Sequence, residues 1–181
     1  MAAPGHLAAC ELQELRTADV PAAAGQCREL FVDATWNAAA VGRMLGGPGC
    51  FALLARAAGQ GAGLVLARAA ADECEILWLA VVPSRRRNGI GRALLRAALR
   101  RAAGLGARTA YLEAAAANRA AIALYGGEGF QRSGRRVAYY QGARDGAPGD
   151  ALVYKRALEP GEEGPPQSSE SRRTNGQTKI S

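Results

Sequence analysis

The chain has few of the residues from which metal sites and covalent active sites are built. Its four cysteines lie far apart, with no Cys-x-x-Cys pair, and its only histidine is His6. A zinc site needs clustered cysteine or histidine ligands, and Ser-His or Cys-His catalysis needs a positioned histidine. The sequence therefore argues against a metal cofactor and against a covalent enzyme intermediate. We interpret the cysteines as small buried residues in a reducing cytosol, which predicts a cytoplasmic protein.

Long apolar runs are also absent. None reaches the roughly 18 residues that a membrane-spanning helix requires, and residues 1–20 have no apolar secretory core. We therefore expect neither a membrane partner nor a signal peptide. Of the 181 residues, 49% are hydrophobic, 22% are charged and only 6% are aromatic. This mix is typical of a globular chain, and the length fits one domain.

Acidic residues are missing from one stretch of the chain, residues 76–112. The same stretch contains eight arginines: Arg85, Arg86, Arg87, Arg92, Arg96, Arg100, Arg101 and Arg108. Positive charge without nearby carboxylates creates a field that attracts an anion. A nucleic acid, a phosphorylated cofactor or an anionic surface would each fit this field, and so would a solvated helix face without a ligand.

The alternation of apolar and polar segments predicts an α/β domain over residues 7–158. It lies between a loose arm over residues 1–6 and a disordered tail over residues 159–181, which is rich in Pro, Gly, Ser and charge. Strands are predicted over residues 10–15, 51–55, 63–67, 75–82, 109–113, 130–140 and 151–154. Helices are predicted over residues 20–32, 37–44, 91–105 and 118–125, with caps offered by residues 17–19 and by Asn37.

These elements predict how the sheet is connected. Residues 51–55 and 63–67 form a hairpin with its turn at Gln60 and Gly61, and a parallel step joins 75–82 to 109–113 through the long helix. We expect a mixed, mostly antiparallel sheet of about seven strands flanked by about four helices.

Residues 79–95, LAVVPSRRRNGIGRALL, carry the clearest ligand-binding pattern. A buried strand ends at Pro83, a basic loop follows, and a helix begins near Ile90. Gly89 and Gly91 leave backbone N–H groups open at a helix N-terminus, which favours anions. Three adjacent arginines add charge-assisted bonds. The pattern fits a cradle for a pyrophosphate, and the alternative is an arginine-rich turn without a ligand.

Two common phosphate-binding motifs do not fit this loop. A P-loop needs Lys and then Ser or Thr directly after its last glycine, but Arg92 and Ala93 follow Gly91. A dinucleotide fingerprint needs a third glycine, which the loop lacks.

Further segments follow at set spacing: Tyr111-Leu112-Glu113, then Asn118 through Tyr125, then Gly129-Phe130 and Tyr139-Tyr140. With the loop over residues 86–91, they resemble the GCN5-related N-acetyltransferases (GNAT), and more narrowly their ribosomal-protein-alanine N-acetyltransferase (RimI) type. The resemblance covers roughly residues 10–157. It implies a single-domain acetyltransferase fold that uses acetyl-coenzyme A as co-substrate and no metal.

Acetyl transfer to an amine needs a base. An α-amine is mostly protonated at neutral pH because its pKa is about 7.7–8.0. Glu113, the polar end of an apolar strand, is the candidate that takes this proton. The resemblance implies the same role for Glu113, and it makes Tyr125 the acid that serves the departing thiolate. The alternative for Glu113 is an exposed glutamate at a strand end without a catalytic role. The alternative for Tyr125 is a tyrosine that only packs in the core.

The resemblance also assigns residues to acetyl-coenzyme A. They are Leu79, Ala80, Val81, Arg86, Arg87, Asn88, Gly89, Ile90, Gly91, Arg92 and Asn118. The three strand residues would offer backbone groups to the pantetheine arm, because a bulge in this strand opens the sheet in the superfamily. Asn118 is in addition a good helix N-cap. Trp36 and one of Tyr139 and Tyr140 are candidates for the acceptor side.

The leading hypothesis for the acceptor is a ribosomal protein N-terminal peptide, namely the N-terminal alanine of small-subunit ribosomal protein eighteen. The family commonly has Leu-Glu-Val-Arg where this chain has Leu-Glu-Ala-Ala, and its E-x-x-G-F appears as Gly126-Gly127-Glu128-Gly129-Phe130. The alternatives are a small-molecule or lysine amine and a catalytically silent RNA-associated module. We expect no direct nucleic-acid binding, because no aromatic residues are interleaved with the arginines.

Overall fold

The computed structural model describes residues 10–32, 36–140 and 149–159. Its strands are β1 (Glu11–Leu15), β2 (Cys50–Ala57), β3 (Gln60–Ala70), β4 (Glu73–Val81), β5 (Thr109–Ala115), β6 (Gln131–Tyr140) and β7 (Gly149–Ala157). Its α-helices are α1 (Val20–Gln26), α2 (Ala38–Leu45), α3 (Ile90–Gly104) and α4 (Arg119–Gly127). The predicted arm and all of the predicted tail beyond Glu159 lie outside the described residues.

The strands form one sheet in the order β1-β2-β3-β4-β5-β7-β6. Every neighbouring pair is antiparallel except β4 and β5, which are parallel and joined through α3. The predicted mixed, mostly antiparallel sheet of seven strands with four flanking helices is therefore confirmed.

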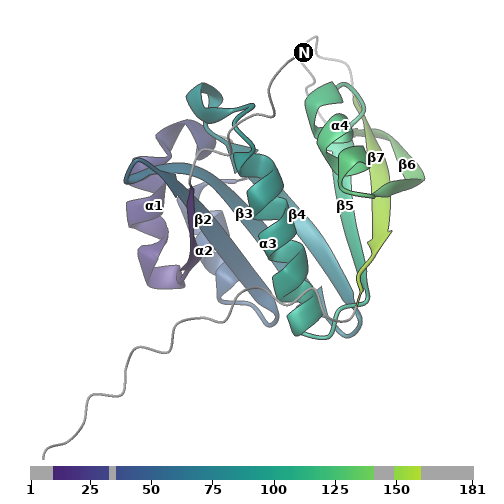
Figure 1. Cartoon of the computed structure of the whole chain (residues 1–181), viewed down its shortest axis with the longest axis horizontal. Coiled ribbons are helices and arrows are strands. Elements are labelled where there is room, and N and C mark those ends of the chain that lie inside the picture. The colour runs from purple at the N-terminus through teal and green to yellow at the C-terminus, as the bar shows by residue number, and fades with distance from the viewer. Residues whose placement is uncertain (1–9, 33–35, 141–148, 160–181) are drawn as a thin grey trace, which may run out of the picture.

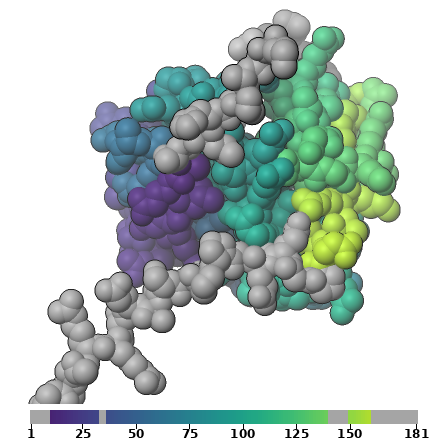
Figure 2. Space-filling model, viewed as in Figure 1, coloured from purple at the N-terminus to yellow at the C-terminus, as the bar shows by residue number. Residues whose placement is uncertain are grey.

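Two hydrophobic cores lie on the two faces of the sheet. Helices α3 and α4 cover one face, which Figures 1 and 2 show toward the viewer, and α1 and α2 cover part of the other. The residues of α3 predicted to face the core are all at most 1% exposed: Leu94, Leu95, Ala98 and Leu99. Alternation along β2 divides its residues between the two cores, because successive side chains of a strand point to opposite faces.

Strand β4 separates from β5 halfway along its length. Ile76 is opposite Ala67 of β3 whereas Trp78 is opposite Leu66, so Leu77 is an extra residue that forms a bulge. Pairing with β5 ends at Ile76 and Leu112, so residues 77–81 and 113–115 are not paired with each other, and the two strands separate there (Figure 1). We call this unpaired part of the two strands the opening. The predicted bulge is confirmed.

Three local predictions need correction. Helix α1 ends at Gln26, where Cys27 leaves the helical conformation, and only a short 3₁₀ helix over Arg28–Leu30 follows. Residues 17–19 form another 3₁₀ helix. Asp19 is the N-cap residue of α1 but makes no side-chain cap, because its carboxylate instead accepts a hydrogen bond from Arg16 Nε at 3.1 Å. The hairpin turn lies at Ala58 and Gly59, whose positive φ angles of 52° and 73° suit the strand twist.

Asn37 is a predicted cap that is confirmed. Its side-chain oxygen accepts a hydrogen bond from the Ala40 backbone N–H at 2.9 Å at the start of α2. Such a bond satisfies one of the N–H groups that a helix leaves unpaired at its first turn.

Candidate functional site

The basic loop leads from the end of β4 into the N-terminus of α3. Gly89 is the N-cap residue of α3 and has φ +79°, a left-handed conformation that a glycine adopts without strain. No side chain at this position caps the helix, so the loop presents backbone N–H groups at the positive end of the helix dipole. Ile90, only 2% exposed, anchors the loop in the core.

Gly91 has a different reason to be a glycine. A Cβ at this position would lie 3.5 Å from Val81 Cγ2 and 3.6 Å from Leu124 Cδ2, which are ordinary contacts. The packing of the protein therefore leaves room for an alanine at position 91. A bare backbone at this position would allow the close approach of a ligand, which is what the predicted pyrophosphate cradle requires.

Two of the predicted cofactor-binding arginines make contacts within the protein. Arg86 Nε donates a hydrogen bond to the Val81 carbonyl at 3.0 Å, which ties the loop to the end of β4. Arg92 Nε lies 2.9 Å from the Glu128 carboxylate, beyond the end of α4. Arg87 is exposed, as is Asn88.

The strand residues assigned to the cofactor border the opening. Leu79, Ala80 and Val81 pair with β3 on one side and have no β5 partner on the other. Gly63 of β3 allows this close pairing, because a Cβ there would lie 2.8 Å from the Ala80 carbonyl oxygen. The free side of β4 is therefore available to an extended ligand, as the resemblance implies.

Glu113 and Tyr125 lie on opposite sides of β5. Leu112 and Ala114 are buried under α3, so the alternation of a strand places Glu113 on the other face. Glu113 is also the first β5 residue beyond the last pair with β4. Tyr125, 7% exposed, packs on the α3 side against Phe130 and Tyr154, with ring centroids 6.0 and 6.3 Å away.

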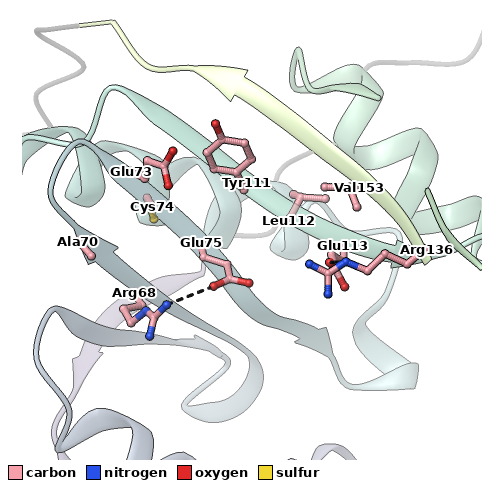
Figure 3. A pocket seen from close by; sticks show the side chains of 10 residues that line it. All are labelled: Arg68, Ala70, Glu73, Cys74, Glu75, Tyr111, Leu112, Glu113, Arg136 and Val153. Atoms are coloured by element: carbon pink, nitrogen blue, oxygen red, sulfur yellow. Dashed lines mark ion pairs between the residues drawn. The ribbon is translucent and has the colours of Figure 1, made fainter. Parts of the chain in front are cut away.

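A depression of about 270 Å³ lies at Glu113 (Figure 3). Its lining residues are Arg68, Ala70, Glu73, Cys74, Glu75, Tyr111, Leu112, Glu113, Arg136 and Val153. Sequence reasoning identified only Glu113 among its polar residues. The alternation of Glu73 and Glu75 with Cys74 and Ile76 along β4 is the signal that could have shown a polar face there.

The polar residues of the depression lie in pairs. Arg136 Nε is 3.0 Å from Glu113 Oε1, and the Glu113 side chain is 20% exposed. Arg68 Nη2 is 3.7 Å from Glu75 Oε2.

Two neighbouring groups have raised pKa values. Burial, together with the charge of Glu73 and its hydrogen bond, raises the pKa of the Tyr111 phenol. Burial, and secondarily the charge of Glu75, raises the pKa of the Cys74 thiol to about 12. Because the thiolate is the nucleophilic form, this raised pKa disfavours a nucleophilic role for Cys74.

The remaining predicted residues lie around these features. Asn118 caps α4, since its side-chain oxygen accepts a hydrogen bond from Ala121 N at 3.1 Å, which confirms the predicted cap. Trp36 is half-buried and stacks on Trp78 beside the bulge of β4, with ring centroids 5.6 Å apart. Tyr139 is 49% exposed, with the Arg136 guanidinium 5.2 Å from its ring centroid. The side chain of Tyr140 lies outside the described part of the chain.

The described residues contain neither a metal-binding cluster nor a membrane-spanning helix. No group of three or more His, Cys, Asp or Glu there could hold a metal ion. Among the described helices, none is both long enough and apolar enough to cross a membrane.

Several known proteins are similar to this chain in sequence or in fold. Over 132 residues it is 39% identical to the N-alpha-acetyltransferase RimI of Mycobacterium tuberculosis, covering 70% of this chain and 82% of that protein. Over 82 residues it is 38% identical to the [Ribosomal protein bS18]-alanine N-acetyltransferase of Escherichia coli K12, covering 45% of this chain and 55% of that protein.

Solved structures agree with these relatives. The crystal structure of the ribosomal-protein-S18-alanine N-acetyltransferase from Escherichia coli matches with a TM-score of 0.74 and 26% identity, covering 92% of this chain and 100% of that one. Nourseothricin acetyltransferase matches with a TM-score of 0.57 and 30% identity, covering 62% and 67%. Residues 12–130 match the acetyltransferase (GNAT) family. The chain therefore belongs to this family of N-acetyltransferases, which use acetyl-coenzyme A, and it resembles RimI.

Proposed function

We propose that this protein acetylates the α-amine of a protein N-terminus, with the N-terminal alanine of ribosomal protein bS18 as its acceptor. The name of the Escherichia coli relative supports this acceptor, and we propose the cytoplasm as the compartment in which a ribosomal protein would be acetylated. The observation that carries the proposal is the opening between β4 and β5, with the cradle of α3 on one side and Glu113 on the other.

The acceptor binds in the depression at Glu113. Three of its lining side chains are about half exposed, at 52% for Arg68, 48% for Glu75 and 57% for Arg136, so the depression is open to solvent. An open depression that spans several strands suits an extended peptide. The carboxylate of Glu113 attracts the positively charged N-terminus of that peptide.

Binding of the acceptor exchanges one ion pair for another. Arg136 occupies the Glu113 carboxylate at 3.0 Å, so the ammonium group of the acceptor must replace the guanidinium there. The exposed Arg136 side chain keeps its contact with the Tyr139 ring as it withdraws.

The residues then act in sequence on the proton and on the leaving group. Acetyl-coenzyme A supplies the acetyl thioester. Glu113 accepts a proton from the acceptor ammonium, which leaves a neutral amine able to attack the thioester carbon. A C–N bond forms as the C–S bond breaks, and the Tyr125 hydroxyl donates a proton to the departing thiolate. The nitrogen loses its second proton as it becomes an amide, and this proton returns the tyrosinate to its neutral form. Residues 86–91 hold the phosphates through backbone N–H groups.

A small-molecule amine is the second candidate acceptor. The match to nourseothricin acetyltransferase favours it. In addition, the carboxylates of the depression would attract a polyamine. A catalytically silent RNA-associated module finds no support, because the relatives of this chain are enzymes.

Mass spectrometry of acceptor peptides tests the proposal. The protein is incubated with acetyl-coenzyme A and a synthetic bS18 N-terminal peptide, and fragmentation locates the acetyl group. We expect it on the α-amine of the alanine. The control is the same peptide with a blocked α-amine and free lysine side chains. Acetylation only of lysine, or only of polyamines in a parallel panel, would contradict the proposal.

A further inference from the structure

A buried carboxylate lies at the end of α4, and it has no part in the proton transfer assigned to Glu113. Glu128 is the one charged or polar residue that is buried among those the structure describes, with its side chain 3% exposed. Its Oε1 atom is 2.9 Å from Arg92 Nε, and its Oε2 atom accepts a hydrogen bond from Arg96 Nε at 2.7 Å. Arg96 Nη2 donates a second bond to Oε1 at 3.1 Å. We call these three residues the Glu128 clamp.

The local sequence makes room for the clamp. A Cβ at Gly127 would lie 3.6 Å from Arg92 Nη2, so the guanidinium lies against the backbone of the last turn of α4. The carbonyl end of a helix also favours a cation. The shift of acid and glycine in Gly126-Gly127-Glu128 therefore has a structural consequence, because it places the carboxylate between the two arginines.

A carboxylate is not required at this position by packing alone. Burying a charge is costly, and an apolar side chain of similar size fills such a position at no loss of stability in many proteins. The arginines are 51% and 56% exposed, so they can return to water if the carboxylate is removed. Packing alone therefore does not account for a carboxylate at position 128.

The clamp joins the two helices that border the opening. Arg92 and Arg96 lie in the first two turns of α3, directly after the loop over residues 86–91. Glu128 follows α4, which carries Asn118 at its start and Tyr125 three residues before Glu128. Figure 1 shows α3 and α4 on the same side of the sheet, on either side of the opening. Helix α4 also has its own support, because Tyr125 packs on Phe130 and Tyr154.

We infer that Glu128 is a positioning residue for acetyl-coenzyme A, which fixes the start of α3 relative to α4 by holding Arg92 and Arg96. This inference rests on the proposed placement of acetyl-coenzyme A at residues 86–91. A ligand that contacts both helices loses affinity when their separation is no longer fixed, because binding must then order them.

Binding of coenzyme A to variants of the full chain tests this inference. Isothermal titration calorimetry measures the Kd for coenzyme A, and thermal unfolding measures the Tm. For Glu128→Leu we expect a Tm close to that of the parent and a Kd weaker by about 10-fold. Glu128→Gln keeps one oxygen acceptor, so its Kd for coenzyme A is expected to lie between those of the parent and of Glu128→Leu. The KM for acetyl-coenzyme A should rise in parallel, with the KM for the acceptor unchanged.

The matched control is a glutamate of β1 that pairs with an arginine near the C-terminal end of α3. Glu14 pairs with Arg101 of α3 at 2.6 Å, away from the loop, so Glu14→Gln should leave the Kd for coenzyme A unchanged. A folded Glu128→Leu protein with parental affinity would overturn the inference, as would an equal loss in Glu14→Gln. If both Glu128 variants fail to fold, the clamp is a folding determinant and the inference is wrong. Failure of the parent protein to bind coenzyme A would instead contradict the proposed function.

Discussion

The face of the sheet opposite α3 is built in two different ways. Where α1 and α2 cover it, the strands contribute aliphatic side chains that are at most 1% exposed: Ala52, Leu54, Leu64 and Leu66. Where neither helix covers it, β4 and β5 contribute Glu73, Glu75, Tyr111 and Glu113 on the same face. The first region holds the fold together, and the second carries the candidate acceptor site.

The difference shows where this fold can carry polar chemistry. Charged side chains that stay partly in water lose little hydration, and their ion pairs add little to stability. The uncovered region is therefore free to use carboxylates for binding and proton transfer. In the proposed function, the opening between β4 and β5 gives this region access to a cofactor bound on the other face.

Glu113→Gln should have the largest effect and should be confined to the uncovered region. The amide keeps the shape of the side chain but cannot accept the proton of the acceptor. We expect the acetylation rate at neutral pH to fall by about 10²- to 10⁴-fold, which is the usual contribution of a general base. Steady-state assays of thiol release measure it, and the free energy of unfolding should hardly change. A rate within about threefold of the parent would remove Glu113 from the mechanism.

Tyr125→Phe should have a smaller effect, from the other side of β5. A thiolate is a good leaving group, so we expect a loss of about 10²-fold, at the low end for acid catalysis. The Kd for coenzyme A measured by calorimetry should stay close to the parent value, because the ring still packs on Phe130 and Tyr154. A loss of coenzyme A affinity without a loss of kcat would argue that the hydroxyl only binds.

Leu66→Ala tests the covered region. This leucine is 0% exposed, so its truncation leaves a cavity and should lower the free energy of unfolding by about 2–5 kcal/mol. Denaturant unfolding measures the loss. A change below about 1 kcal/mol would show that α1 and α2 repack over the sheet and that the two regions are less different than they look.

Glu75→Gln is the matched substitution in the uncovered region and should have the smallest effect. It breaks the pair with Arg68, but both side chains are about half exposed, at 48% and 52%. The free energy of unfolding should therefore change by less than about 0.5 kcal/mol in the same denaturant experiment. A loss comparable to that of Leu66→Ala would mean that the uncovered region also holds the fold together.

Most of the fold could be predicted from local patterns. Apolar runs predict β2, β3 and β4, the other four strands are predicted as well, and Asn37 and Asn118 mark the starts of α2 and α4. The end of α1 was missed because Cys27 leaves the helix within a stretch that still reads as amphipathic.

The site was predicted less completely, because its partners are distant in the sequence. Glu113 was singled out, but its contact with Arg136 depends on β7 lying between β5 and β6. The displaced acid at Glu128 was noticed, but the sequence alone did not connect it to Arg92 and Arg96, about 30 positions earlier. Gly89 is predicted to make space for a ligand, but its φ of +79° favours a glycine independently of any ligand. Substitutions at Gly89 would therefore mix backbone strain with lost binding.

The pH dependence of the Glu113→Gln defect tests the central claim most directly. The acceptor ammonium has a pKa of about 7.7–8.0, so solvent supplies more neutral amine as the pH rises through this value. If Glu113 removes the proton, the ratio of parental to variant rate is large near pH 6 and shrinks steadily toward about pH 9.5. A ratio that stays constant over that range would contradict the account, and Glu113 would then orient the acceptor without taking its proton.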